Sequence, residues 1–370
     1  MISVPYTAMY TAKQLIAEVT ALQMLQTIGL FVCAYILMGW NGDRLEAYAV
    51  YMTMIPVLIM LALVVRACCA FPECSVRFAY FVQPDKLKKL FAFAGGDFFG
   101  WLGGTVRDQG MAILINHNFG LGTNASYTIS NQVSSHAMSL SNAMMGALIP
   151  AMTTAEGAGN HEESVSLAFR GIKFGVLSIV LFAIPLIIEM DEILRLWLVV
   201  PPPESALFCR CMLVAFICHK LGFGHHLAIL AGGRVVMYQI VVGSVAAGGI
   251  AIASIGLFLK LGLVGVACSF VVTFVLMTLV RVAFARKLCN MSVRHWLLRV
   301  VAPILLTGFI SLACGGAVQV MMDVSIVRLF LVVLVSTVMT VLQGYVVVLD
   351  AGERSFLKGV VRRLKCRLYG

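Results

Sequence analysis

The chain has 370 residues, of which 61% are hydrophobic and only 12% are charged, and its formal net charge is +10 at pH 7. Soluble globular domains have about 45–50% apolar and about 25% charged residues, so this composition excludes an ordinary water-soluble protein. Because a single aqueous core stops growing at about 250–300 residues, we expect lipid to cover much of the apolar surface. The place of each charge then matters more than the sum, and no nucleic-acid partner is expected.

Ten mostly apolar runs follow one another along the chain, each near the length of about 20 residues that a spanning helix needs. The runs are too long and too uniformly apolar for the strands of a membrane barrel. The sequence therefore predicts an all-α, polytopic membrane protein with spans at 19–39, 46–66, 88–116, 122–152, 172–189, 205–231, 235–258, 261–285, 300–321 and 326–348.

Ten spans put both termini on one side, and short cytoplasmic loops retain Lys and Arg. Twenty basic residues fall on the terminal side, Lys173 and Arg281 among them, and the other side receives only Arg44, Arg195, Lys260 and Arg328. We therefore expect a multi-pass protein with both termini cytoplasmic. The basic tail Glu353–Leu368 has the pattern of an amphipathic helix that contacts membrane lipids.

The third span carries charges, which are costly in a membrane and therefore suggest a function. Asp97 and Asp108 fall on one line with Trp101, and a neighbouring line contains Gly96, Gly100, Gly103 and Arg107. Glycines on a stripe permit close approach of another helix. Arg107 suits a phosphate or another planar anion, whereas Asp97 or Asp108 suits a proton or a sodium ion as ion-coupling residue.

Two further expectations concern these charges. Arg107 and Asp108 are adjacent in sequence, so their side chains are expected to diverge rather than to form a mutual salt bridge. The alternative to a functional role is that Arg107 and Asp97 pair with other helices for structural reasons.

The fourth span has a polar stripe about 27 Å long by the helical rise. Its opposite side contains apolar residues together with Ser126, Ser130 and Ser141, whose hydroxyls can bond to their own helix. We interpret the stripe as the lining of a water-filled cavity, and the alternative is that it joins packed helices. Its members are Asn124, Thr128, Asn131, Gln132, Ser135, Ser139 and Asn142.

The sixth span contains Lys220, next to His219 and to the helix-loosening Gly222 and Gly224. Its depth in the span makes Lys220 a second candidate contact for an anionic cargo. No grouping of His, Cys and carboxylates has the density of a metal site, so we expect neither a metal nor a cofactor.

Several short motifs resemble those of the polysaccharide-biosynthesis flippases. These proteins export lipid-linked oligosaccharides and belong to the superfamily that also contains the MATE drug antiporters and the lipid II flippases. The resemblance depends on Val4–Met9, on Arg107–Gly110 leading into Ile113–Asn116, on Asn131–Val133, on Pro185–Met190 and on Ile193–Leu198.

The resemblance implies two six-helix lobes that face each other across a central cavity and open it alternately to either side. It divides this chain into residues 1–80, a remnant of the first lobe; 81–289, the second lobe; and 290–370, two appended helices and the basic tail. About four helices of the family's first lobe are missing. We therefore expect that the sequence begins at an internal start site of a longer gene or comes from a truncated gene model.

The cargo that the resemblance implies is an undecaprenyl-pyrophosphate-linked oligosaccharide, turned from the cytoplasmic to the periplasmic leaflet of a bacterial inner membrane. It places Arg107 and Asp108 among the cavity-facing residues, and we add Gln109 and Asn116 of the same run as substrate contacts. The amide-rich stripe suits sugar hydroxyls, and a cation suits the pyrophosphate. The expected partners are this cargo, membrane lipids, and a glycan polymerase or glycosyltransferases.

Three alternatives compete with this interpretation. A cation-coupled multidrug antiporter of the same superfamily would want a more apolar, aromatic and acidic cavity. A membrane enzyme would need an acid/base pair, and only His136 lies in the polar span, away from the stripe. We therefore expect no enzyme, and the third alternative is a non-transporting membrane partner of glycan-assembly enzymes.

Overall fold

The computed structural model describes residues 4–355 apart from residues 14, 41, 75–83, 199 and 234. Across these ranges the chain forms helices and no strand. Eight of the helices are long and apolar enough to cross a membrane. The prediction of an all-α, polytopic membrane protein is therefore confirmed. Most of the predicted basic tail, from residue 356 onward, lies outside the described residues.

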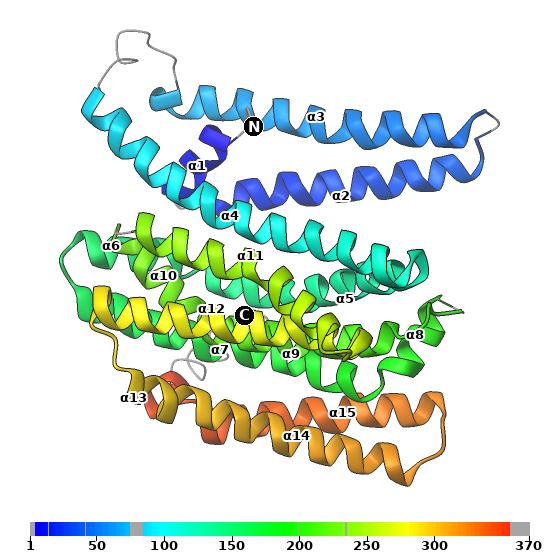
Figure 1. The fold of residues 1–370 in the computed structure, drawn as a ribbon. Helices are drawn as coiled ribbons and strands as arrows, with labels where there is room; N and C mark the ends of the chain where they lie inside the picture. Colours follow the sequence, from blue (N-terminus) through cyan, green and yellow to red (C-terminus); the bar gives the residue numbers. More distant parts are fainter. Residues whose placement is uncertain are drawn as a thin grey trace, which may run out of the picture. The chain divides into compact units, whose positions relative to one another are not determined.

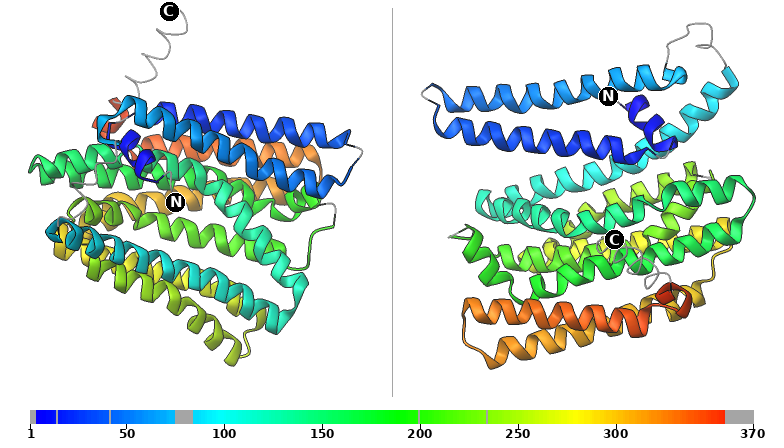
Figure 2. Two further views of the ribbon diagram at one scale, coloured as in Figure 1. Left: turned by 90° about the horizontal axis from the view of Figure 1, so that it is seen from above. Right: turned by 180° about the vertical axis from the view of Figure 1, so that it is seen from behind.

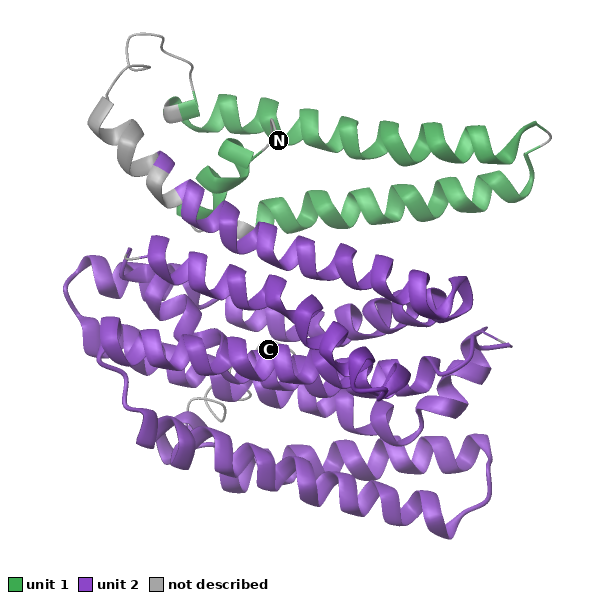
Figure 3. Cartoon of the chain, viewed as in Figure 1, with its two compact units in different colours: residues 1–87 green, residues 88–370 purple. Residues whose placement is uncertain are grey.

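The chain divides into two compact units, residues 1–87 and 88–370 (Figure 3). In unit 1, two long antiparallel helices pack together, and a small core forms around Tyr10 and Phe71 (Figure 1). The carboxylate of Asp43 caps the second of them by accepting hydrogen bonds from the N–H groups of Leu45 and Glu46. The elements of unit 1 are α1 (Val4–Ala12), α2 (Ile16–Met38), α3 (Arg44–Ala70) and the turn η1 (Pro72–Cys74).

Unit 2 is a bundle of long helices that run back and forth across the unit and are joined by short turns (Figures 1 and 2). Its first helix, α4, begins at the end of unit 1. The elements are α4 (Pro84–Phe119), α5 (Leu121–Gly146), α6 (Ile149–Gly157), α7 (His161–Ile188), α8 (Met190–Leu198), α9 (Ser205–Leu221), α10 (Phe223–Ala231), α11 (Val236–Phe258), α12 (Gly262–Cys289), α13 (Val293–Trp296), η3 (Leu297–Val301), α14 (Ala302–Met321), α15 (Ile326–Gln343) and η4 (Gly344–Val348).

The glycine line of α4 packs against α11. A methyl group at Gly103 would overlap the carbonyl oxygen of Gly243, and one at Gly96 would lie 3.0 Å from the Cα atom of Val236. Two backbones approach this closely only where side chains are absent. The predicted role of these glycines is confirmed, and the contact turns the buried line of α4 toward α11 and α12.

Helix α5 has one packed face and one accessible face. It follows a turn at Gly120, whose φ of 83° favours glycine, and it then packs against α7 and α9. Ser126, Ser130 and Ser134 lie fully buried on the packed face, together with Tyr127. The local sequence explains this choice, because small side chains leave room for close packing, and the hydroxyls of Ser126 and Ser130 donate to carbonyls of their own helix.

A break at Gly222 separates α9 from α10 and lets α10 pack closely on α7. A methyl group at Gly224 would lie 2.5 Å from the carbonyl oxygen of Ala168. Helix α12 packs along both α9 and α11 and ends at Cys289, followed by Asn290, whose φ of 49° makes it a left-handed cap. The helices α9 to α12 thereby form one packed group around buried aromatic rings.

Helices α14 and α15 form an antiparallel pair that packs on α7 (Figure 1). At one end the buried Arg328 guanidinium donates to the Glu189 carboxylate over 2.9 Å. At the other end the Lys173 ammonium of α7 donates to Asp350 over 2.6 Å and to Glu353 over 3.1 Å. Charged hydrogen bonds therefore hold one end of the pair to α7 and the other end to Glu189, the residue that follows α7.

Three residues that the sequence analysis counted as loop charges are buried in the bundle: Lys173, Arg281 and Arg328. That assignment was wrong, because each pairs with or lies among groups of neighbouring helices rather than facing water. The predicted sidedness consequently depends on the remaining loop residues and stays a prediction.

Two of the ten predicted spans, within α4 and α5, are not among the eight apolar helices. Their length suffices, since 36 and 26 residues extend about 54 and about 39 Å at the helical rise. Their polar residues lower the hydropathy, so their passage through the membrane stays a prediction. These same residues make α4 and α5 the helices of interest for function.

Candidate functional site

The polar stripe of α5 lies on the accessible face of the helix. Among its members, Thr128, Gln132, Ser135, Ser139 and Asn142 are exposed, and Asn124 and Asn131 are half-buried. The spacing of three and four residues keeps them on one side, as the periodicity predicts. The bundle therefore leaves a continuous row of amide and hydroxyl groups available to a ligand or to water.

The hydroxyls of the stripe bond within α5 itself. Ser135 donates to the carbonyl of Gln132 over 2.9 Å, and Ser139 donates to that of His136 over 2.7 Å. Hydrogen bonds from α5 to other segments come mostly from the packed face, where Ser126 donates to the carbonyl of Pro203 over 2.7 Å. In the described part of the stripe only Asn142 bonds to another helix, as the acceptor for Lys220. Within the described residues this division favours the cavity-lining interpretation of the stripe over the helix-joining one.

Lys220 connects the stripe to the interior of unit 2. Its side chain is fully buried, its ammonium donates to Oδ1 of Asn142 over 2.5 Å, and it lies 4.0 Å from the centre of the Phe223 ring. Because Asn142 is exposed, this hydrogen bond joins the accessible face of α5 to a buried cation on α9.

A second buried cation, Arg281 of α12, lies 5.8 Å from the centre of the same ring. Its guanidinium donates to the carbonyl of His219 over 3.2 Å and lies 2.9 Å from Nε2 of that ring. Nε of Arg281 and Nδ1 of His219 have no hydrogen-bond partner although both are buried. We call Lys220, Arg281, His219 and Phe223 the cation cluster.

The cation cluster contains no carboxylate among the residues that the structure describes. Arg281 is only 4% exposed and Lys220 is 0% exposed. Burying a charge costs several kcal/mol unless it is paired, and a buried donor without an acceptor adds to the cost. An arrangement of this kind is suited to receive an anion.

Arg107 approaches the cluster from α4. Its guanidinium lies 4.5 Å from the centre of the Phe274 ring, which is also 4.9 Å from the ring of His219. It also pairs with Asp108 over 2.8 Å. The expectation that Arg107 and Asp108 diverge was wrong: Arg107 lies over Phe274 on the buried line, and its long side chain turns back to the carboxylate of the next residue.

The other predicted residues of α4 lie away from the cation cluster. Asp97 accepts a hydrogen bond of 2.7 Å from the Gln239 amide of α11, which supports the alternative that it pairs between helices. Gln109 and Asn116 are exposed. The structure therefore joins Asn142 to the cation cluster through Lys220, and Arg107 borders the cluster through the Phe274 and His219 rings. No described contact joins Asp97, Gln109 or Asn116 to the cluster.

Arg281 was missed as a candidate because the predicted span ended at residue 285. Helix α12 continues to Cys289, so Arg281 lies eight residues before its end, or about 12 Å inside. The sequence signal for Arg281 was a cation two turns inside an apolar helix. The sequence analysis missed this signal because it counted Arg281 as a loop charge.

Comparison with known proteins finds no matching family model, no matching curated protein and no matching solved structure.

Proposed function

We propose that this membrane protein carries undecaprenyl-pyrophosphate-linked oligosaccharides from the cytoplasmic to the periplasmic leaflet of a bacterial inner membrane. The amide and hydroxyl groups of the α5 stripe contact the sugar hydroxyls. The cation cluster, with Arg107, receives the pyrophosphate. No covalent chemistry is involved, and the cargo leaves unchanged.

One observation supports this proposal most directly: the Lys220 ammonium reaches the stripe through Asn142. A lipid-linked oligosaccharide has its sugars next to its phosphates, so a carrier needs neutral polar groups and cations side by side. Phosphate oxygens accept strong hydrogen bonds from Lys and Arg, stronger than those of an amide oxygen. The pyrophosphate would consequently displace Asn142 as the acceptor for Lys220.

Arg107 takes part through exchange of partners. Its ion pair with Asp108 includes a carboxylate that is about half exposed, 47% for the side chain. A dianionic phosphate competes well against such a half-solvated carboxylate, because Arg donates to it in a bidentate manner. Cargo binding thus releases the Asp108 carboxylate from Arg107. The released carboxylate binds a proton or a sodium ion, so that cargo binding and ion binding are coupled.

The sign of the buried charge distinguishes this proposal from the alternative of a cation-coupled multidrug antiporter. A carrier for cationic drugs is best served by acidic groups in its binding site, whereas the cluster here is cationic. Two buried cations would repel such a cargo.

The test replaces Lys220 with Met in the native host. It measures the ratio of exported surface glycan to the lipid-linked oligosaccharide that accumulates inside the cell. We expect Lys220→Met to lower export by at least about tenfold, because a hydrogen bond to a charged group is worth about 1.5–3 kcal/mol. Membrane levels of the protein should not change.

Lys287→Met is the matched control, since Lys287 is an exposed lysine on α12 outside the cluster. It should export normally. Normal export by Lys220→Met at normal protein levels would contradict the proposed pyrophosphate contact.

A further inference from the structure

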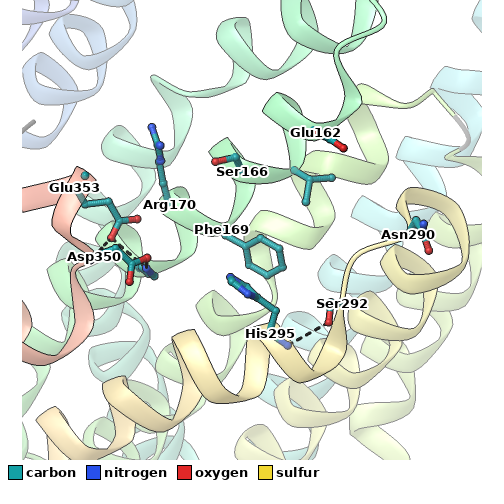
Figure 4. Close-up of a pocket in the computed structure, with 12 residues that line it drawn as sticks. Glu162, Ser166, Phe169, Arg170, Asn290, Ser292, His295, Asp350 and Glu353 are labelled. Carbon is teal, nitrogen blue, oxygen red and sulfur yellow. Dashed lines mark hydrogen bonds and ion pairs between the residues drawn. The ribbon is translucent and has the colours of Figure 1, made fainter.

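A cavity lined mainly by polar residues lies at the end of the bundle where α7 begins, and the proposed function does not use it. Its volume is about 580 Å³. Its wall comes from four segments of unit 2: the first turns of α7, the link from α12 to α13, the start of α13, and residues 350–353 (Figure 4). The lining is mixed in charge, with Glu162, Arg170, Lys173, Asp350 and Glu353 contributing to it.

One side of the cavity is firmly built. Lys173 is buried at 2% exposure between Asp350 and Glu353, and Glu353 also accepts the N–H of Asp350 over 2.8 Å. The guanidinium of Arg299 also lies 3.9 Å from Asp350, so two cations neutralise the two carboxylates in the wall. A ring pair forms another side, since the rings of Phe169 and His295 are 4.9 Å apart.

The cavity lies at the level where spans end. The apolar helices that border it stop at Cys289 and Val348, and the next one starts at Val293. Helix α7, with 28 residues, is about 42 Å long and exceeds a hydrocarbon core of about 30 Å, so its first turns stand in the headgroup layer. A ligand here would belong to that layer.

Two charges of the cavity have no partner among the described residues. Arg170 and Glu162, both on α7, are exposed and make no ion pair or hydrogen bond with the described chain. In the view of Figure 4, Arg170 lies to the left of Phe169 and Glu162 lies to its upper right. A ligand that carries both a phosphate and an ammonium matches this arrangement, because Arg binds phosphate and an ammonium is attracted by a carboxylate and an aromatic face.

We propose that this cavity binds the phosphate–amine headgroup of a zwitterionic phospholipid, with Arg170 on the phosphate and with Glu162 and Phe169 on the ammonium. A lipid with only a negative headgroup would place that charge near Glu162 without a compensating amine. The site is thus selective for an amine-bearing phospholipid and ties α7, α13 and the end of the α14–α15 pair to it.

The test uses the full chain, purified in detergent and freed of lipid, with p-benzoylphenylalanine in place of Ser166 on the cavity wall. The probes are dihexanoyl-phosphatidylethanolamine, dihexanoyl-phosphatidylglycerol and free phosphoethanolamine. Photo-crosslinking and the rise in Tm on binding are the two readouts. We expect saturable crosslinking and a higher Tm with phosphatidylethanolamine, and binding at least about tenfold weaker with the other two.

Two variants assign the contacts. Arg170→Gln should weaken phosphatidylethanolamine binding by about tenfold, and Glu162→Gln should abolish the preference over phosphatidylglycerol. Arg286→Gln, which removes an exposed arginine elsewhere, is the matched control, and all three should keep the Tm of the lipid-free protein. Equal binding of both lipids to the unmodified cavity, or unchanged binding in Arg170→Gln, would overturn the proposal. Free phosphoethanolamine that binds as tightly as the lipid would overturn the assignment to a phospholipid.

Discussion

Two buried lysines of unit 2 have opposite surroundings. The Lys173 ammonium on α7 has two carboxylates, Asp350 at 2.6 Å and Glu353 at 3.1 Å. The Lys220 ammonium on α9 has one amide oxygen, that of Asn142, and the face of Phe223. Both side chains are almost completely shielded from solvent, at 2% and 0% exposure.

The difference distinguishes a structural charge from a charge kept for function. Coulombic attraction repays the desolvation of Lys173, and that site holds the end of the α14–α15 pair. No described carboxylate does so for Lys220 or its neighbour Arg281. Natural proteins leave buried charges without a counter-charge mainly at functional sites. For this reason we place the anion contact at Lys220 and Arg281.

The largest predicted effect concerns the paired lysine. Lys173→Met leaves Glu353 buried without its cation, so the free energy of unfolding should fall by about 3–5 kcal/mol. Thermal unfolding in detergent would measure it. Adding Glu353→Gln should restore part of the loss, because the two residues interact directly. A stability equal to that of the parent would show that the pair does not hold these helices.

The second prediction makes Lys220 resemble Lys173. Asn142→Asp keeps the shape of the side chain but adds a carboxylate 2.5 Å from the ammonium. Because Asn142 is exposed, stability should rise by only about 1 kcal/mol. Export should nevertheless be lost, since the new carboxylate occupies the place proposed for the pyrophosphate.

Asn131→Asp is the control for that experiment, because it adds the same charge to the stripe eleven residues away from Asn142. Its stability should not rise. Full export by Asn142→Asp at normal protein levels would show that Lys220 does not bind the pyrophosphate.

A third, smaller effect compares the two faces of α5 by thiol labelling. With the exposed Cys68, Cys69 and Cys268 replaced by Ser, Ser135→Cys should react with a membrane-impermeant maleimide at least about tenfold faster than Ser134→Cys. The reason is that Ser135 is exposed and Ser134 is buried. Equal inertness of both would place the stripe against lipid or another helix instead of water.

The features that the sequence predicted correctly are those with a local cause. Helical periodicity sufficed to put Ser135 and Asn142 on one face of α5, and a glycine spacing sufficed to predict the close approach at Gly103. Both depend on the geometry of one helix.

Tertiary partners were not predictable in this way. The pairing of Lys173 joins residues 177 and 180 positions apart, and Arg281 meets His219 across 62 positions. Nothing in the local pattern of α7 or α12 indicates these partners. The Arg107–Asp108 pair was missed for a related reason: adjacent residues on a helix point apart at Cβ, but the length of arginine lets its guanidinium return, and Phe274 of α12 supports it there.

The smallest predicted effect is a pH dependence at the Lys173 site. The hydrogen bond from Lys173 lowers the pKa of Asp350 below its ordinary value of 3.8, so this carboxyl binds a proton less readily in the folded state than in the unfolded state. Its contribution to stability is therefore complete above that ordinary value and is lost as the pH falls toward the lowered folded value. Because the Asp350 side chain is 53% exposed, the loss should be slight, a decline in Tm below about pH 4 that Asp350→Asn lacks. Asp350→Asn should therefore flatten the acid limb of the Tm profile. The same decline in the parent and in Asp350→Asn would mean that other carboxyls cause it and that Lys173 depends on Glu353 alone.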